Sequence, residues 1–348
     1  MKKSSSKNSR PIPVKRPVYT SKDPRRQRNT SPWFIVVGVV FILICLSTGI
    51  IFVRNGSRTN GVTPTNSITF ETTASSTPTA LLSPTAKFIL MPDIPSLQLM
   101  ILELINQDRR AEGLDPLELD QTAATVGVVQ AQEMAKYGYL SYWNLDGLGP
   151  DLRFFSNGGV ESITERSYRK QIVSEILPTI PNDWDALVRN IYAEYSQSPS
   201  FREAILNPAF THSGIGVAYD NSTGWFVVTQ EFVGKYISIA TLPRTVSLGT
   251  EIDLVGTINY PDIQSVSIEL KYEPIPNRRT LADLNSISDF VSIAETFQSF
   301  DLSVAQGQFG EKILMDYLGQ KGYYHIYVWI NTPKTGRFLV VDYIIQVV

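Results

Sequence analysis

The chain has 348 residues, 43% of them hydrophobic, which is enough for two domains with extensions. Its formal net charge is −2, but residues 1–32 hold ten Lys and Arg against one acid. They therefore carry +9, which leaves −11 for the rest of the chain. A mildly acidic body of this kind argues against nucleic acid as the main partner, and the position of the basic arm suggests a role other than contact with nucleic acid. The single cysteine, Cys45, excludes an intramolecular disulfide, so the folded parts depend on their hydrophobic cores.

The basic arm of residues 1–32 is followed by an uncharged apolar run over residues 33–53. At about 1.5 Å per residue this run spans roughly 30 Å, which predicts one transmembrane helix. The Lys/Arg excess before it predicts a single-pass membrane protein with a cytoplasmic amino terminus and residues 54–348 outside the cell. The length of the run and of the arm favours an uncleaved anchor. Small residues at positions 47–49 leave a cleaved signal peptide as the alternative.

Residues 54–94 have the composition of a linker. Twelve of the thirty residues from position 61 to position 90 are Ser or Thr, with three prolines among them. Such a segment buries too little apolar surface to offset the entropy lost on ordering. We expect a flexible tether between the membrane and the folded part of the chain.

Residues 95–235 combine helical and strand patterns. Apolar spacing predicts four helices, at 96–113, 119–138, 183–197 and 198–207. Ser96 and Asp120 are candidate amino-terminal caps, and Gly138 is a candidate stop for the second helix. Two apolar runs around the turn residues 220–224 then predict a β-hairpin. Helices followed by strands favour an α+β fold for this part of the chain.

Residues 236–348 lose the helical periodicity and show five strand-like runs: "YISIATL", "EIDLVGTIN", "SVSIELKYE", "YYHIYVWINT" and "FLVVDYIIQVV". Such runs, mostly separated by turn-rich sequence, predict an antiparallel β-sandwich of immunoglobulin-like type. The stretch "PIPNRRTLADLNSISDF" interrupts them and fits either a long loop or a short helix.

Four segments resemble, in order, those of a known family: "LINQDRRAEGLDPLELD", "EMAKYGYLSYWNLDGLGPDLRF", "SPSFREAILNPAFTHSGIGVAY" and "GWFVVTQEF". Residues 97–235 thus resemble the CAP superfamily, also called SCP-like extracellular or cysteine-rich secretory and pathogenesis-related proteins, in its cysteine-free bacterial form. The resemblance implies a CAP-type α-β-α sandwich and a location outside the cell.

The same resemblance implies a central cavity in which family members often place two histidines and acidic residues around a divalent metal. Tyr142 stands where the first histidine is expected and Phe201 where the second is expected. Glu165 matches a family glutamate, and Glu194 corresponds to another acid of the cavity. With Arg202, these residues are the candidates for lining the cavity. We expect Tyr142, Glu165 and Phe201 to converge on one pocket.

The loss of both imidazoles predicts a metal-free cavity. A phenol with a pKa near 10 is a poor zinc ligand at neutral pH, and a phenyl ring offers no donor. The two histidines of the chain, His212 and His325, fall in different predicted domains, so they cannot restore the pair. No acid-dense loop of the EF-hand type and no G-x-S-x-G elbow is present. We therefore assign no metal ligand, no cofactor and no catalytic residue.

Three hypotheses for function remain. The first is a membrane-anchored extracellular module for binding or adhesion, whose ligand is a lipid, a cell-wall component or a protein. The second is a metal-independent hydrolase that uses Glu165, with Glu194 as a partner carboxylate. The third is a structural spacer at the cell surface. Arg153 and Arg169 are interpreted as surface charges, and Tyr142, Trp143 and Phe201 as core aromatics or ligand contacts.

Overall fold

The computed structural model describes residues 93–172, 181–287 and 290–348. Contacts divide the chain into residues 1–80 and 81–348, and every described residue lies in the second unit. The basic arm, the apolar run at 33–53 and the linker lie outside the described residues. Among the described residues, no helix is both long enough and apolar enough to span a membrane.

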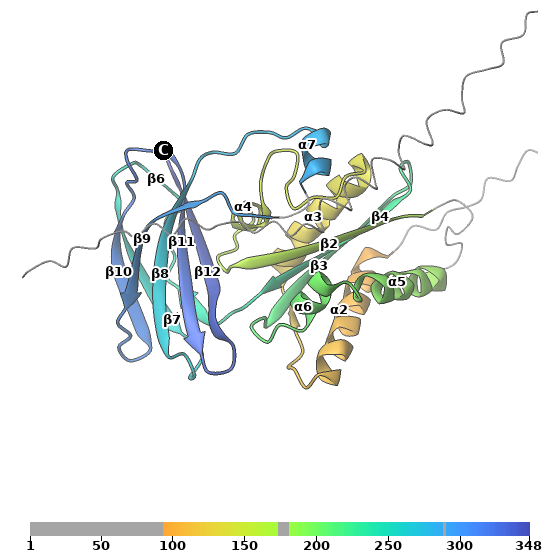
Figure 1. Ribbon diagram of the computed structural model, residues 1–348, viewed down its shortest axis with the longest axis horizontal. Coiled ribbons are helices and arrows are strands. Elements are labelled where there is room, and N and C mark those ends of the chain that lie inside the picture. The colour runs from red at the N-terminus through yellow and green to blue at the C-terminus, as the bar shows by residue number, and fades with distance from the viewer. Residues whose placement is uncertain (1–92, 173–180, 288–289) are drawn as a thin grey trace, which may run out of the picture. The chain divides into compact units, whose positions relative to one another are not determined.

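The first half of the described chain is built on a four-stranded sheet with the strand order β1-β3-β4-β2 (Figure 1). β1 pairs parallel to β3, and the other pairs are antiparallel. The predicted hairpin is confirmed as β3 and β4. The sequence did not predict β2, because polar residues interrupt its apolar pattern. The strands are β1 (Glu118–Leu119), β2 (Ile163–Gln171), β3 (His212–Asp220) and β4 (Trp225–Val233).

Helices cover both faces of this sheet. One face packs on α2, α5 and α6 through a cluster that includes Ile215, Val217 and Phe226. The other face packs on α3 through Ala218 and Val227. Alternate residues of β3 and β4 thus point to opposite helical layers, as a buried strand requires. The helices are α2 (Ile94–Ala111), α3 (Gln121–Tyr137), α4 (Pro150–Ser156), α5 (Pro181–Tyr195) and α6 (Pro199–Ile205).

The ends of α3 are those that the sequence predicts. The Asp120 carboxylate accepts a hydrogen bond from the Ala123 amide at 2.8 Å, and Gly138 closes the helix with φ of 68°. α2 begins earlier than predicted, with Asp93 at the cap position. The predicted cap, Ser96, lies inside the helix and donates to the Asp93 carboxylate at 2.6 Å. Proline in the first turn of α2 explains the early start, because it needs no hydrogen-bond partner there.

The contact between α3 and β3 is so close that it requires glycine. A Cβ atom at Gly216 would lie 2.1 Å from the backbone carbonyl carbon of Gly127 on the helix. The "GIG" stretch of β3 is therefore a steric feature, which lets the helix lie directly against the strand.

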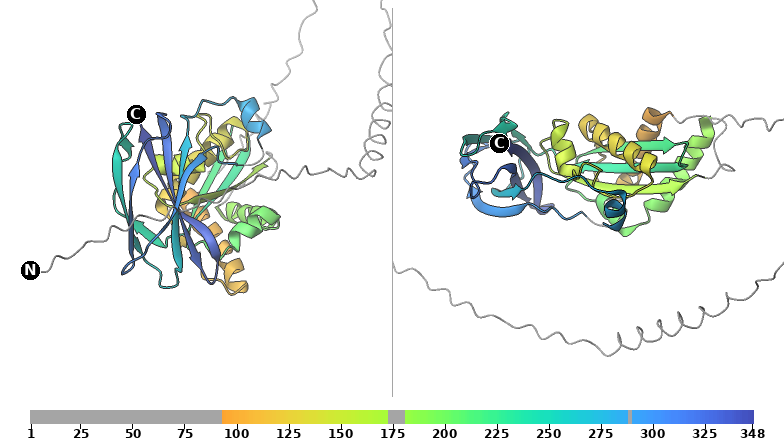
Figure 2. Two further views of the ribbon diagram at one scale, coloured as in Figure 1. Left: turned by 60° about the vertical axis from the view of Figure 1, so that its left-hand side comes forward. Right: turned by 90° about the horizontal axis from the view of Figure 1, so that it is seen from above.

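Residues 237–347 form two sheets. The smaller has the order β10-β7-β5 and the larger the order β6-β12-β11-β8-β9. Figure 2 shows both from the end in its right-hand view. The strands are β5 (Ile237–Ile239), β6 (Thr245–Val246), β7 (Glu251–Ile258), β8 (Ser265–Glu273), β9 (Glu295–Leu302), β10 (Gln308–Leu314), β11 (Gly322–Thr332) and β12 (Gly336–Val347).

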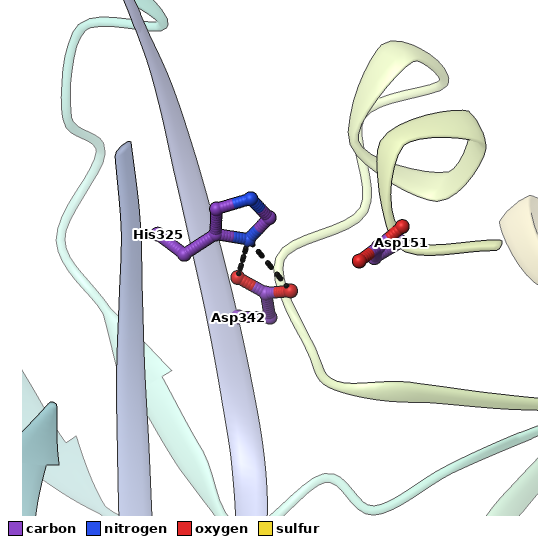
Figure 3. Close-up of side chains that lie close together, drawn as sticks. All are labelled: Asp151, His325 and Asp342. Atoms are coloured by element: carbon purple, nitrogen blue, oxygen red, sulfur yellow. Dashed lines mark hydrogen bonds and ion pairs between the residues drawn. The ribbon is translucent and has the colours of Figure 1, made fainter. Parts of the chain in front are cut away.

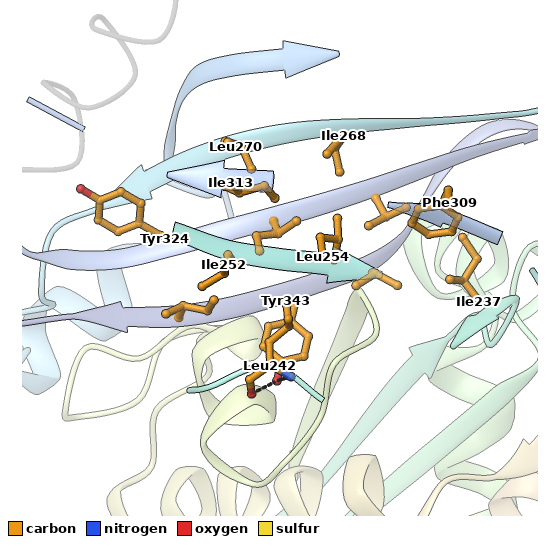
Figure 4. Close-up of a cluster of buried hydrophobic side chains, with 14 of the residues drawn as sticks. Ile237, Leu242, Ile252, Leu254, Ile268, Leu270, Phe309, Ile313, Tyr324 and Tyr343 are labelled. Carbon is orange, nitrogen blue, oxygen red and sulfur yellow. Dashed lines mark hydrogen bonds between the residues drawn. The ribbon is translucent and has the colours of Figure 1, made fainter. Parts of the chain in front are cut away.

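One hydrophobic core joins the two sheets (Figure 4). Leu254 from the small sheet and Ile268 from the large sheet are fully buried in it. Tyr343 anchors the connection after β5, since its hydroxyl donates to the Leu242 carbonyl at 2.6 Å. The sequence did not predict β9 and β10, because most of their side chains are polar and exposed.

The interrupting stretch contains a short helix, α7 (Leu281–Ser286). The Thr280 and Asp283 side chains form a capping box at its start. Leu284 is fully buried against Trp143, which belongs to the first half of the chain. The sequence left a loop and a helix as alternatives, and the structure has the helix.

The halves also meet along β12. The Ser162 amide donates to the Val340 carbonyl at 3.0 Å, and the Asp342 amide donates to the Val160 carbonyl at 3.1 Å. Arg244 donates to three carbonyl groups at the end of α4 and in the loop after it, those of Phe155 at 2.7 Å, Gly158 at 2.8 Å and Gly159 at 3.1 Å. Residues 160–162 of the first half therefore pair through their backbone with β12, a strand of the larger sheet.

Candidate functional site

A hollow of about 380 Å³ opens between β2, the loop before α4 and the segment after α7. Tyr142, Glu165 and Phe290 line it, together with Arg166 and Ser200. The rings of Tyr142 and Phe290 are 6.2 Å apart, centroid to centroid, and tilted by 48°. The structure thus brings Tyr142 and Glu165 together. The aromatic wall from Phe290 has no counterpart in the sequence prediction, because it comes from the other half of the chain.

Glu165, which lines the hollow, belongs to a buried ion pair. Arg153 of α4 donates to the Glu165 carboxylate, and the two side chains are only 5% and 0% exposed. Arg153 also donates to the Tyr142 carbonyl at 2.6 Å and to the Leu148 carbonyl at 2.9 Å. The second oxygen of Glu165 accepts from the Ser167 hydroxyl at 2.9 Å. The interpretation of Arg153 as a surface charge is wrong, because its side chain is buried and its two terminal nitrogens donate to Glu165 and two carbonyl groups. Its Nε is buried without a hydrogen-bond partner among the described residues.

A second carboxyl group, that of Glu231 on β4, lies beside this pair and is fully buried. Burial, and then the neighbouring charge of Glu165, raises the pKa of Glu231 well above its ordinary value, although Arg153 opposes the shift. Burial and the nearby Glu165 thus favour the protonated form of Glu231.

Phe201 is buried away from the lining of the hollow. It is 6% exposed, and its ring lies 4.7 Å from that of Tyr195, centroid to centroid. Tyr195 in turn accepts a hydrogen bond from Gln230 at 2.6 Å. Ser200, which precedes Phe201 in the chain, is the residue of α6 that lines the hollow. Phe201 therefore belongs to the core between α5, α6 and the sheet.

Glu194 and Arg202 do not reach the hollow. Glu194 forms an exposed ion pair with Lys170 and accepts from the Tyr168 hydroxyl at 2.6 Å. Arg202 pairs with Glu112 at 2.9 Å, with both side chains about half exposed. Their assignment as cavity residues needs correction, because the turns of α5 and α6 on which they stand point these long side chains to solvent. Glu194 also cannot act with Glu165 as a carboxylate pair.

A second cluster of ionisable side chains lies where α4 meets the large sheet (Figure 3). One ligand atom from each of Asp151, His325 and Asp342 lies within 4.8 Å of the others. His325 Nδ1 is 2.9 Å from an Asp342 oxygen, and its Nε2 is 3.4 Å from a Glu273 oxygen. Sequence analysis missed this cluster, since its members are far apart along the chain and only the alternation of β11 and β12 hints that they share a face.

The electrostatics of this second cluster are unusual. Burial by itself lowers the pKa of His325, but the Asp342 and Glu273 carboxylates outweigh it and raise this pKa to about 10. Burial, followed by the charges of Asp342 and Glu273, raises the pKa of Asp151 to about 6, against the influence of His325. His212 is separate from this cluster. It contacts Thr211 at 2.8 Å and Glu118 at 3.5 Å.

Comparison with known proteins identifies the family of residues 102–232. The model of the CAP family, described as the cysteine-rich secretory protein family, matches residues 102–232. This range holds the four-stranded sheet and the helices that cover it. Residues 102–232 are a CAP domain.

The relatives of this CAP domain are bacterial. The uncharacterized protein YkwD of Bacillus subtilis (strain 168) is 26% identical over 137 residues, which cover 39% of this chain and 46% of that protein. An extracellular SCP-domain protein from Bacillus anthracis is 22% identical, with a TM-score of 0.32 over 42% of this chain and 44% of that one. An outer surface protein from Borrelia burgdorferi is 16% identical, with a TM-score of 0.33 over 42% and 97%.

The side chains at the hollow do not fit the zinc ion that the family resemblance implies. Its described lining offers no imidazole and no thiolate. The Arg153 guanidinium already neutralises Glu165. Zinc in proteins favours imidazole and thiolate ligands, so the hollow lacks the donor set on which a zinc-dependent reaction would depend.

Proposed function

We propose that this protein is an extracellular binding module, anchored in the membrane by residues 33–53 and displayed on the linker of residues 54–94. The observation that carries the binding role is the hollow of the CAP domain. It combines the rings of Tyr142 and Phe290 with the polar groups of Arg166 and Ser200. Its size of about 380 Å³ lies within the usual range for small-molecule sites.

The chemistry of the hollow favours a ligand with one apolar or sugar-like face and a few hydroxyl groups. Aromatic rings provide flat apolar contact, and Arg166 and Ser200 add hydrogen-bonding groups at the rim. The Glu165 carboxylate is held by Arg153 and Ser167, so it accepts no further strong cation. We infer a neutral or weakly anionic ligand, with cell-wall fragments and lipids as the classes to test.

Hydrolysis by Glu165 finds no support in this arrangement. A general base must be positioned to accept a proton from the substrate or from a water beside it, and an ion pair with an arginine makes a carboxylate a weaker base. Arg153 contacts one carboxylate oxygen of Glu165 and Ser167 the other. Glu194, the suggested partner, is bound to Lys170 at the surface.

We also propose that residues 236–348 are an immunoglobulin-like domain for adhesion or spacing. The support is a pair of mainly antiparallel sheets around one core, built without a disulfide. The proposed boundaries of the other parts are residues 1–32 for the cytoplasmic arm and 95–235 for the CAP domain with its flanks.

A thermal-shift screen of the full chain in mild detergent tests the binding role. Cell-wall fragments and lipids are each added to the wild type and to Tyr142→Ala. A ligand that binds in the hollow raises the unfolding temperature of the wild type and has a weaker effect on the variant. Arg110→Ala, a change in an exposed ion pair on α2, serves as the matched control. If no wall fragment or lipid stabilises the wild type, the protein is better described as a spacer.

Protease treatment of intact cells tests the topology. Because the basic arm predicts a cytoplasmic amino terminus, added protease should remove residues 54–348 and leave a short membrane fragment. If the body of the protein is protected until the cells are lysed, the proposed topology is wrong.

A further inference from the structure

The cluster of Asp151, His325, Asp342 and Glu273 joins the CAP domain to the large sheet of the second half. Asp151 stands at the start of α4, whereas Glu273, His325 and Asp342 stand on β8, β11 and β12. Figure 3 shows Asp151 approaching the His325–Asp342 pair from the helix side. The cluster is separate from the hollow of the CAP domain, with which it shares no lining residue.

The charges of this cluster do not balance. Three carboxyl groups surround one imidazole, and His325, Asp342 and Glu273 are 0%, 6% and 2% exposed. Within the described part of the chain, no Lys or Arg forms an ion pair with any of these carboxyl groups. One imidazolium offsets at most one of these carboxylates, and further buried carboxylates without a counter-charge are costly, so the site favours an added cation.

The positions of the donor atoms suit a small divalent ion. The ligand atoms of Asp151, His325 and Asp342 lie within 4.8 Å of one another. Around a tetrahedral zinc with bonds of about 2.0–2.1 Å, neighbouring ligand atoms lie about 3.3 Å apart. Side-chain rotations can close this difference, because Asp151 is only half-buried and can turn toward the pair.

His325 is oriented as a metal-binding histidine. Its Nε2 faces Glu273 at 3.4 Å, which leaves Nδ1 directed at Asp342 and the centre of the cluster. Metal-bound histidines commonly donate their other ring N–H to a carboxylate, which fixes the ring and its tautomer. The second oxygen of Glu273, Oε1, is buried and has no hydrogen-bond partner among the described residues. His325 Nε2 is likewise buried without a hydrogen-bond partner among the described residues, so a donor and a carboxylate acceptor stand next to each other for this outer contact.

We propose that Asp151, His325 and Asp342 bind one divalent transition-metal ion of the zinc type, with Glu273 as the outer partner of His325. The imidazole ligand favours zinc-like ions over calcium, which takes six to eight oxygen ligands. The bound ion replaces the proton that His325 Nδ1 otherwise shares with Asp342. It ties α4 of the CAP domain to β11 and β12, so its role is to fix the two halves together.

Calorimetric titration of the full chain with zinc, after dialysis against a chelator, tests this proposal. We expect one zinc ion per chain and a higher unfolding temperature on binding. Asp151→Asn keeps the shape of the side chain and removes its charge, so it should weaken zinc binding at least tenfold. Asp146→Asn, an exposed carboxylate in the loop before α4, is the matched control and should bind zinc as the wild type does.

A cobalt titration provides a second measurement that does not depend on stability. Cobalt bound at a four-coordinate site absorbs visible light strongly, and this absorbance should appear in the wild type and Asp146→Asn but be lost in Asp151→Asn. Absence of stoichiometric zinc binding overturns the proposal. Equal binding by wild type and Asp151→Asn also overturns it, as does a preference for calcium over zinc.

Discussion

Arg153 and Glu165 show how one pair of side chains defines the chemistry of the hollow. Both side chains are nearly excluded from water, and they form an ion pair with each other. Removing one partner of such a pair leaves an uncompensated buried charge, which typically costs about 3–5 kcal/mol. The position of the Glu165 carboxylate at the hollow is therefore fixed by the Arg153 guanidinium.

Glu231 beside this pair predicts an unusual pH dependence. Its pKa is raised in the folded state, so its contribution to stability is complete below the ordinary pKa of 4.5 and is lost as the pH rises through the folded value. Glu231→Gln removes this titration. We expect the variant to gain stability relative to the wild type between pH 4 and pH 8, measured by urea unfolding at both values.

Glu194 provides a control of opposite sign. The Lys170 ion pair and the Tyr168 hydroxyl lower its pKa, so its contribution is present above the ordinary pKa and is lost as the pH falls. Glu194→Gln should slightly destabilise the protein at pH 8 and have no effect in acid. If Glu231→Gln is less stable than the wild type at pH 8, the buried carboxyl group is not protonated as described.

Phe201 is a packing residue in the structure, and its truncation should show this. Phe201→Ala removes a ring that is 6% exposed and packed on Tyr195, which typically costs about 3–5 kcal/mol. Tyr137→Ala, at a site that is 43% exposed, should change the unfolding free energy by less than about 1 kcal/mol. A loss of under about 1 kcal/mol for Phe201→Ala in urea unfolding would contradict the packed position.

At the scale of elements, α7 and the described residues on either side of it, 274–287 and 290–294, form a strap from the β-sandwich to the CAP domain. Leu284 is its buried anchor, and Phe290 packs on Trp143 at 5.2 Å between ring centroids. The guanidinium of Arg279 lies over the Trp143 ring, 4.4 Å from the ring centroid. The second half of the chain thereby supplies one wall of the hollow in the first.

Leu284→Ala should release this strap without unfolding the sheets. A buried leucine truncated to alanine typically loses about 2–5 kcal/mol, and Leu284 is the one residue of α7 that is fully buried. Amide hydrogen exchange over residues 280–287 should accelerate strongly, whereas β11 should remain protected. Leu281→Ala, on the same helix and 40% exposed, should leave both unchanged. Unchanged exchange in Leu284→Ala would show that the strap is held elsewhere.

At the scale of the whole described region, Arg244 joins the two halves. It donates to three carbonyl groups of the CAP domain and lies over the Phe155 ring at 4.8 Å. Hydrogen bonds from a charged donor each contribute about 1.5–3 kcal/mol in favourable cases. This residue therefore couples the stability of the CAP domain to that of the sandwich.

Arg244→Ala should uncouple the two halves. We expect the thermal unfolding of the variant to separate into two transitions, or to broaden, where the wild type has one. Arg337→Ala, which removes an exposed pair with Glu269, should leave the transition as it is. A single, unbroadened transition in Arg244→Ala would indicate that the pairing of residues 160–162 with β12 is sufficient for coupling.

Much of the fold could be predicted from local sequence. The caps of α3 and the β3–β4 hairpin follow from short-range patterns, since a helix cap or a tight turn involves residues a few positions apart. The four segments that resemble the CAP family are also contiguous stretches of sequence, and they predicted the CAP domain. β2, β9 and β10 were not predicted, because their exposed polar residues break the alternation that marks a strand.

The candidate sites depended on tertiary structure. Tyr142 and Glu165 were found through the family resemblance, but Arg153, Glu231 and Phe290 were not, and Glu194 and Arg202 point elsewhere. The charge of an arginine is visible in the sequence, whereas its burial and its partner are decided by elements that meet only in the fold. The same holds for Asp151, His325 and Asp342. The sequence determined which residue types and local structures this protein has, and long-range packing decided which of them share a low-dielectric interior, where charge and shape create a site.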